Sequence, residues 1–285
     1  QIAYVLDTEA PFPAGQGWDY SDTNYILLAK VMEKVTGRKA YDMIHERILE
    51  PLGLRNTVPS RSAEIPGLVQ GYAGPDNPFG GADALVANGR FAFNPGFEWA
   101  GGGYATSSTD LARWARALYE GRAFDASLLP AVLNGEEAAA LGRGARYGLG
   151  VIIRDTPLGP AWGHSGFFPG YLTEMRYYPE LDGGVVVMSN LGSFDSGALA
   201  GEVAEERPEA ERVLLFYGDV PLLTANDVAA VARKLDEDPA CAIAIATSST
   251  SSMIRIGTSW YRRAVASSAT PLTGPCRKPR RLRPR

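Results

Sequence analysis

Residues 147–188 have the sequence YGLGVIIRDTPLGPAWGHSGFFPGYLTEMRYYPELDGGVVVM, and this stretch decides the fold. Four short runs rich in β-branched and aromatic residues lie at 147–153, 161–164, 171–178 and 184–188, with Gly and Pro turns between them. Runs of this length and spacing are typical of consecutive antiparallel strands. We therefore predict an antiparallel meander.

The residues before the meander have a helical period instead. A helix is predicted over 24–36, where apolar residues recur every three or four positions before Gly37: Leu28, Val31, Met32 and Val35. Further helices are expected over 40–49, and over 110–119 with Ser108 or Thr109 as its cap. Residues 53–99 are rich in Pro, Gly and Asn, which indicates a long irregular excursion. Helices followed by a meander predict an α+β fold, an antiparallel sheet flanked by helices with a helical and irregular subdomain.

Three compositional zones divide the chain. Residues 1–205 have the composition of a folded domain, closed by a helix over 196–206. Residues 206–240 predict a strand, a loop and a helix. Residues 241–285 are rich in Ser, Thr, Pro and Arg, and six of the last nine residues are basic, so we expect an irregular or disordered basic tail.

Composition excludes some classes of function. The net charge of −4 over 285 residues gives no reason to expect nucleic acid as a partner. No run of about 18 apolar residues is present, so no membrane span is expected. No signal peptide opens the sequence, which starts at Gln1. With only Cys241 and Cys276, the redox compartment stays open.

Two loops carry candidate chemistry. In the first, Tyr20 directly precedes the helix predicted over 24–36, whose free N–H groups stabilise a nearby phenolate. A Tyr hydroxyl with a lowered pKa accepts a proton and later returns it, although Tyr20 could equally just pack beside a helix cap at Asp22 or Thr23. In the second, His164 and Gly166 lie at the end of a predicted strand, in a loop that could equally be a hairpin corner.

These loops occur in a fixed order with two further segments. YSDTNYILLAKVMEKVTGRKAYDMIHERILEPLGLRNT (20–57) is followed by the excursion, by AGGGYATSSTDLARWARAL (100–118) and by GHSGFFPGY (163–171). Over about residues 10–200 this order resembles the serine hydrolases of the class C β-lactamase, D-alanyl-D-alanine carboxypeptidase and esterase type. The resemblance implies a β-lactamase/transpeptidase-like fold, an acyl-enzyme mechanism, a small-molecule or peptidoglycan-peptide substrate, no cofactor, and an exported parent protein. It leaves β-lactam, peptide and ester substrates open.

The resemblance also implies roles for individual residues. Tyr20 matches the family's proton-transfer Tyr, and Asp22 the position of an Asn that holds the substrate amide. The substrate-binding strand is matched by His164, Ser165 and Gly166. The backbone N–H of Phe167 then completes the oxyanion hole.

Two departures from the family pattern bear on activity. The family nucleophile lies in Ser-x-x-Lys upstream of the Tyr loop, and no Ser here is followed by Lys three positions later. With nineteen residues before Tyr20, we expect a hydrolase domain that is incomplete at its N-terminus and inactive as given. The second departure is Asp22 in place of Asn, since a carboxylate would pair with the Lys and hold it protonated.

Residues 206–240 resemble a different family. ERVLLFYGDVPLLTANDVAAVARKL (211–235) is similar to a segment of bacterial N-acetylglucosamine-1-phosphate uridylyltransferases, in which the Asp matched by Asp219 binds a divalent metal. A plain strand-loop-helix explains the pattern equally, and one Asp cannot form a metal site. The alternative to a partial serine hydrolase is thus a non-catalytic fused fragment or part of a uridylyltransferase.

Overall fold

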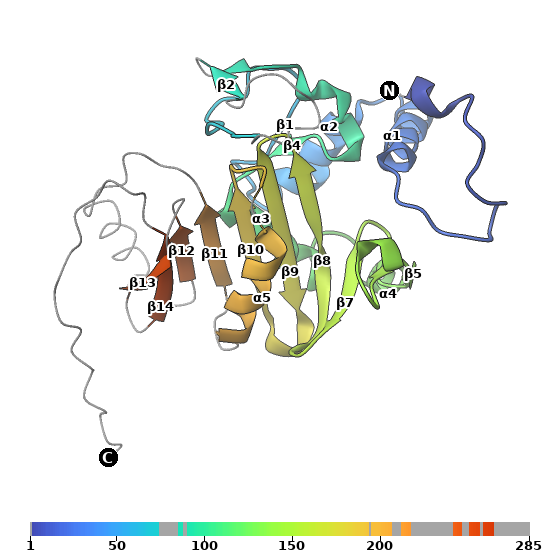
Figure 1. Cartoon of the computed structure of the whole chain (residues 1–285). Coiled ribbons are helices and arrows are strands. Elements are labelled where there is room, and N and C mark those ends of the chain that lie inside the picture. Colours follow the sequence, from blue (N-terminus) through green and yellow to red (C-terminus); the bar gives the residue numbers. More distant parts are fainter. Residues whose placement is uncertain are drawn as a thin grey trace.

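The computed structural model contains a main sheet of eight strands, in the order β12-β11-β10-β9-β8-β7-β6-β5 (Figure 1). It describes residues 2–73, 85–87, 90–193, 195–206, 212–217, 242–246, 251–256 and 259–264. The strands of the sheet are β5 (Glu136–Glu137), β6 (Arg146–Tyr147), β7 (Ile152–Thr156), β8 (Gly159–Phe168), β9 (Tyr171–Tyr178), β10 (Gly183–Ser189), β11 (Arg212–Tyr217) and β12 (Ala242–Ala246). Neighbours from β5 to β10 are antiparallel, which confirms the meander. β11 and β12 extend the sheet in parallel.

One predicted strand is wrong in its bounds. The run 147–153 is divided between β6 and β7, because the chain turns sharply between them. Gly150 has a φ of 75°, in the left-handed region that an L side chain rarely adopts. The apolar residues of this run therefore belong to two antiparallel strands, with Tyr147 opposite Ile152.

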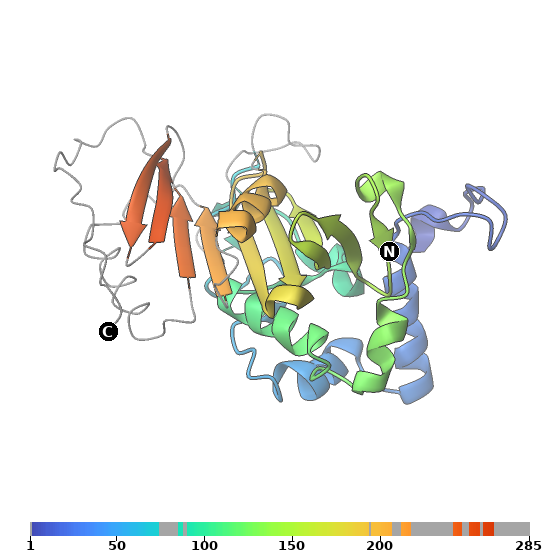
Figure 2. The same ribbon diagram turned by 90° about the horizontal axis from the view of Figure 1, so that it is seen from below.

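Helices cover both faces of the sheet (Figure 2). The helices other than the short 3-10 helices are α1 (Asp22–Thr36), α2 (Ala40–Ile44), the π-helix η2 (His45–Leu49), α3 (Ser108–Tyr119), α4 (Leu129–Val132) and α5 (Ser196–Glu206), and the two that cover the faces are α3 and α5. On one face, α3 packs through Leu118 and Tyr119 against β9 and β10. On the other face, α5 packs through Ala200 and Ala204 against Val187 of β10. The α+β class predicted from the sequence is confirmed.

Where the structure describes the excursion after α2, at 53–73, 85–87 and 90–99, it is mostly irregular, as expected. Its short elements are β1 (Val58–Pro59), β2 (Val86–Ala87), β3 (Arg90–Phe91), η3 (Pro95–Phe97) and η4 (Trp99–Gly101), and it rejoins the fold where β4 (Tyr104–Ala105) pairs with β1. The remaining short helices are η1 (Ile2–Val5), η5 (Ala126–Leu128), η6 (Ala139–Leu141) and η7 (Pro179–Leu181). In the range 241–285, the part that the structure describes consists of β12 and of the paired strands β13 (Ser251–Ile256) and β14 (Ser259–Ala264).

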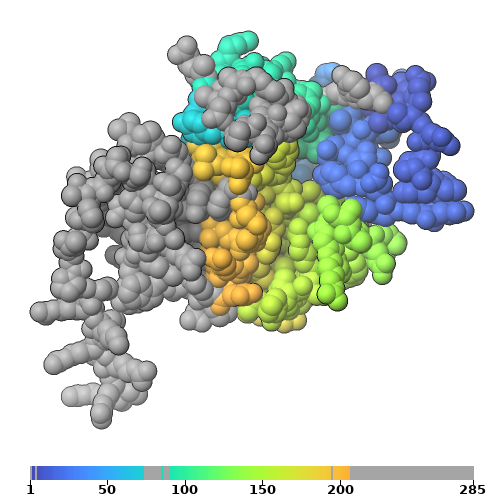
Figure 3. Space-filling view, viewed as in Figure 1, coloured from blue at the N-terminus to red at the C-terminus, as the bar shows by residue number. Residues whose placement is uncertain are grey.

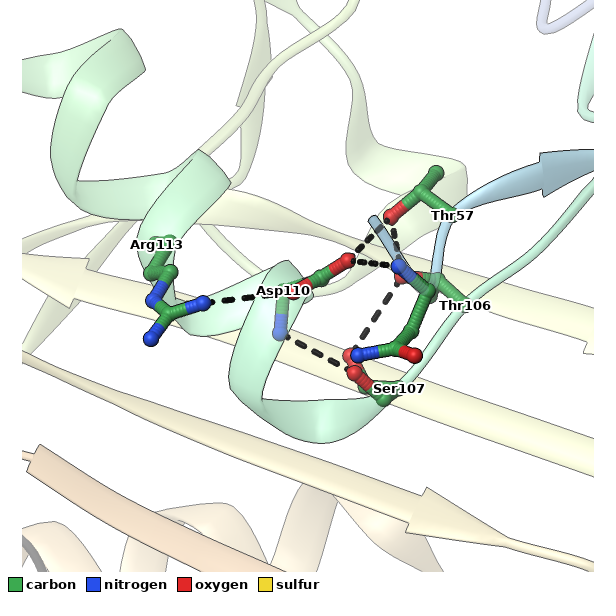
Figure 4. Close-up of polar contacts among 6 residues, drawn as sticks. Thr57, Thr106, Ser107, Asp110 and Arg113 are labelled. Atoms are coloured by element: carbon green, nitrogen blue, oxygen red, sulfur yellow. Dashed lines mark hydrogen bonds and ion pairs between the residues drawn. The ribbon is translucent and has the colours of Figure 1, made fainter. Parts of the chain in front are cut away.

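A buried carboxylate ties the excursion to α3 (Figure 4). The side chain of Asp110 has no solvent exposure, and its Oδ2 accepts the backbone N–H of Asn56 at 2.7 Å and the hydroxyl of Thr57 at 3.2 Å. Its backbone N–H donates to Ser107 Oγ, so the helix cap lies one residue before Ser108. Arg113 lies 3.6 Å from the other carboxylate oxygen. The start of the excursion is therefore fixed to the first turn of α3.

Candidate active site

The first predicted loop leads into the N-terminus of α1. Helix α1 begins at Asp22, and Ser21 at the N-cap position makes no side-chain capping bond. Tyr20 Oη donates a hydrogen bond of 2.9 Å to Asp22 Oδ1. Asp22 therefore binds the Tyr20 hydroxyl, and the predicted cap at Asp22 or Thr23 is wrong.

The electrostatics of Tyr20 differ from the sequence-based expectation. Burial, followed by the hydrogen bond and negative charge of Asp22, raises the pKa of the Tyr20 hydroxyl well above its usual value. The prediction of a lowered pKa is wrong for this arrangement, because burial and the adjacent carboxylate both disfavour the phenolate. Tyr20 is a neutral donor at physiological pH.

The second predicted loop is not a loop, because it forms the far half of β8. Strand β7 pairs with β8 only as far as Ile152 opposite Gly163. From His164 to Phe168, β8 has a described strand neighbour only in β9. Ser165, Gly166 and Phe167 are exposed along this edge. An edge of this kind leaves backbone groups free to pair with an extended ligand.

The two glycines of β8 beside His164, Gly163 and Gly166, differ in how much space surrounds them. A Cβ on Gly163 would lie 1.7 Å from the carbonyl oxygen of Met175, so no side chain fits there. A Cβ on Gly166 would meet only Thr173, at 3.5 Å, which is ordinary contact. The protein therefore does not require glycine at 166, and that position stays open toward solvent.

His164 is half-buried and held by two hydrogen bonds. Its Nδ1 lies 2.5 Å from the carbonyl oxygen of Ser165, and its Nε2 lies 2.9 Å from Tyr147 Oη. A carbonyl oxygen only accepts, so Nδ1 carries the proton. Burial lowers the pKa of His164, which leaves Nε2 neutral and able to accept the Tyr147 hydroxyl.

Tyr147 connects the two predicted loops and was not anticipated from the sequence. Its ring lies 5.7 Å from the ring of Tyr20 and 5.7 Å from that of His164, while Tyr20 and His164 are 6.0 Å apart between ring centroids. Trp18 packs on its other side, at 5.4 Å. Burial and a hydrogen bond with Tyr25 raise the pKa of Tyr147. In the sequence, the position of Tyr147 before the turn at Gly148 and Gly150 was the one signal that could have pointed to this residue.

Glu98 is a second residue that sequence reasoning missed. It lies in the irregular excursion, and no motif marks it. A Cβ on Gly101 would lie 3.0 Å from Asp22 Cβ and 3.6 Å from Glu98 Oε2. The side chains of Asp22 and Glu98 therefore lie close together, on either side of this glycine. Burial, then the charge of Asp22, raises the pKa of Glu98. The surroundings of Tyr20 are thus acidic, with the carboxylates of Asp22 and Glu98 nearby.

The arrangement suits proton transfer and polar recognition. Tyr20, Asp22 and His164 come together from α1 and β8, with Ser165, Gly166 and Phe167 along the same strand edge. Within the described residues, no group of three or more His, Cys, Asp or Glu side chains could hold a metal ion. Asp219 lies outside the described residues. In the part of the chain that the structure describes, no helix is long and apolar enough to span a membrane.

Three known proteins show what this chain is similar to. Penicillin-binding protein 4* of Bacillus subtilis is 29% identical over 192 residues, which are 63% of this chain and 41% of that protein. A D-aminopeptidase of Cereibacter sphaeroides is 26% identical over 207 residues, 70% of this chain and 38% of that protein. The crystal structure of a D-stereospecific amidohydrolase from Streptomyces sp. superposes with a TM-score of 0.59 at 27% identity, covering 72% of this chain and 59% of that one.

The chain thus spans about two fifths of the length of the curated relatives it matches. A model of the β-lactamase family matches residues 2–206, which include α1, the buried Asp110, the meander and every candidate site residue except Asp219. The α+β architecture is the β-lactamase/transpeptidase-like fold. This chain belongs to the β-lactamase family of serine hydrolases.

Proposed function

We propose that this chain is the proton-transfer and substrate-holding part of a serine hydrolase that cleaves amide bonds in D-amino acid derivatives. The observation that carries the proposal is the meeting of Tyr20, Asp22 and His164 at the half of β8 that does not pair with β7. Two relatives, named D-aminopeptidase and D-stereospecific amidohydrolase, favour D-amino acid amides or peptides over β-lactams and simple esters. The Bacillus penicillin-binding protein supports an extracytoplasmic parent.

In this proposal the exposed edge of β8 binds the substrate. Gly166 lets the substrate backbone lie against the strand, and the N–H of Phe167 donates to the oxyanion. His164 cannot offer Nε2 to a substrate while it accepts from Tyr147, so its role is to orient the Tyr147 hydroxyl. Burial, together with the hydrogen bond and charge of Asp22, now holds the proton on Tyr20, so Tyr20 exchanges a proton with the attacking serine only when a cation beside it stabilises the phenolate.

We further propose that the nucleophile comes from the parent protein, because this sequence contains no Ser-x-x-Lys. The chain alone should neither hydrolyse nor trap acyl substrates. Incubation with benzylpenicillin and with D-phenylalanine 4-nitroanilide, followed by intact-mass spectrometry, tests this. A stoichiometric adduct on any serine of the chain contradicts the proposal.

The substrate class is tested in the parent protein, the product of the complete gene. The ratio of kcat/KM for D- and L-phenylalanine 4-nitroanilide should favour the D enantiomer strongly, with little turnover of penicillin. Tyr20→Phe should lower kcat by about 10²–10⁴-fold, the usual contribution of a general acid or base. Equal rates with both enantiomers contradict the substrate class, and an unaffected Tyr20→Phe contradicts the role of Tyr20.

A further inference from the structure

A cavity of about 200 Å³ lies away from the candidate active site, on the α5 side of the sheet. Its walls come from the segment after η6, the end of β7, the turn between β7 and β8, strand β9 and the end of α5. Three arginines line it: Arg143, Arg154 and Arg176. The acidic lining residues, Asp155 and Glu205, are both exposed to solvent, which screens their charge.

The charges buried beside this cavity are not balanced. Glu174, Arg176 and Arg154 have side chains that are 4%, 14% and 23% exposed. Arg176 Nε donates to Glu174 Oε1 at 2.8 Å, and Arg176 Nη2 donates to the carbonyl oxygen of Gly197 at 3.0 Å. Arg154 Nη1 lies 3.7 Å from the same Glu174 oxygen. One carboxylate therefore faces two guanidinium groups, and these three buried side chains carry a net charge of +1.

Helix α5 holds the Arg176 guanidinium in place. Arg154 is therefore the guanidinium whose positive charge is not fully compensated by a carboxylate. A Cβ on Gly197 or on Gly201 would lie about one contact distance, 3.4 and 3.5 Å, from the Arg176 guanidinium, so that guanidinium passes directly beneath the helix. Burial lowers the pKa of Arg154, the cost of a cation with too few anionic partners. A buried charge without full compensation is strongly unfavourable.

We propose that this cavity binds a small oxyanion, a carboxylate or a phosphate, on the guanidinium of Arg154, with Arg143 at the rim. The planar guanidinium fork matches two oxygens of either group. The cavity has the volume for such an anion, and one added negative charge neutralises the buried group. This site is independent of the proposed hydrolase function.

The test is the binding of inorganic phosphate and of acetate to the full chain, by calorimetry and by thermal unfolding, with chloride at matched ionic strength as reference. At least one of the two anions should bind saturably and raise Tm above the chloride reference. The anion that binds shows whether the natural ligand is a phosphate or a carboxylate. Arg154→Met should weaken binding at least tenfold without lowering Tm in chloride. Arg143→Gln, at the exposed rim, should weaken it less.

Arg38→Gln is the matched control, because it removes one positive charge at an exposed pair with Glu46 on the helical side of the molecule. It should bind the anion like the wild type. The proposal is overturned if neither anion stabilises the wild type beyond chloride, or if Arg154→Met binds as well as Arg38→Gln. If Arg154→Met does not fold, an Arg143→Gln variant with wild-type affinity overturns it in the same way.

Discussion

Asp110 illustrates how much one buried side chain contributes to this fold. Its carboxylate accepts from Asn56 and Thr57 and faces Arg113, so it connects segments more than fifty positions apart in sequence (Figure 4). The motif around it was predicted as a helix start, but the sequence could not show its partners. Which backbone N–H groups reach a carboxylate depends on the path of the irregular excursion, and no local pattern encodes that path.

We predict that Asp110→Ala lowers the free energy of unfolding by about 3 kcal/mol, because it leaves buried donors without an acceptor. Asp125→Ala is the control: Asp125 accepts hydrogen bonds from Ser127 at the exposed start of η5, and its loss should cost well under half as much. Urea unfolding of both variants measures the difference. Equal losses would show that the Asp110 contacts add nothing beyond a local cap.

His164 predicts a pH dependence of stability. Its pKa in the folded chain is below the ordinary 6.5, so the unfolded state binds more protons as the pH falls through that range. The His164 contribution is therefore complete above about pH 6.5 and is lost as the pH falls toward the folded pKa. We expect the urea midpoint of the wild type to fall more between pH 7.5 and pH 5.5 than that of His164→Gln. A steeper fall in the variant would mean that the pKa of His164 is raised.

At the scale of elements, helix α1 shows what periodicity can and cannot predict. Its bounds were predicted to within two residues, because the apolar spacing and Gly37 mark them. The part of the chain that contains α1 lies at the edge of the molecule, in blue in Figure 3, and the apolar face of the helix is exposed. Its exposed residues are Leu27, Leu28, Val31, Met32 and Val35, and Val35 is 80% exposed. Spacing finds a face, whereas packing depends on which other elements are present.

We predict that the double variant Val31→Lys/Val35→Lys keeps the unfolding midpoint of the wild type and reduces self-association. A contiguous exposed apolar stripe favours aggregation, and exposed side chains contribute little to stability. Sedimentation velocity over a concentration series measures the first effect, and urea unfolding the second. Ile26→Lys, on the buried face of the same helix, is the control and should destabilise the chain strongly. If the double variant destabilises as much as Ile26→Lys, the stripe is covered in solution.

For the whole molecule, strand pairing within the meander followed from the sequence, while the assembly of the site did not. Short glycine and proline turns force consecutive strands to pair, so β9 and β10 were predicted nearly in full, whereas only 161–164 of β8 was predicted as a strand. Tyr20 and His164 are 144 positions apart, and their contact depends on where α1 lies against the sheet. Tyr147 and Glu98 carry no motif and were missed for that reason. The family resemblance joined Tyr20 to His164, but it could not supply the Asp22 contact that raises the Tyr20 pKa.

The division of the chain near residue 205 remains a prediction, and the strand pairing across this boundary makes it testable. The family model ends at residue 206, yet β11 pairs in parallel with β10 over six positions, from Gly184 opposite Arg212 to Ser189 opposite Tyr217. If residues 206–240 and 241–285 are separate from the hydrolase domain, the meander should stay folded without them.

Digestion by a glutamyl endopeptidase distinguishes these possibilities, because five glutamates lie within residues 202–211. We expect the first cut there and loss of everything beyond Asp238, with a resistant product that contains β7 to β10. Glu180 is the internal control, since it is exposed in the turn between β9 and β10 and should be cut much later. Mass spectrometry of a time course gives the order of cuts. Should the chain from Pro208 onward resist as long as Glu180 does, the β10–β11 pairing holds one cooperative unit and the proposed division is wrong, because a strand that is integral to a sheet is released only when the whole sheet unfolds.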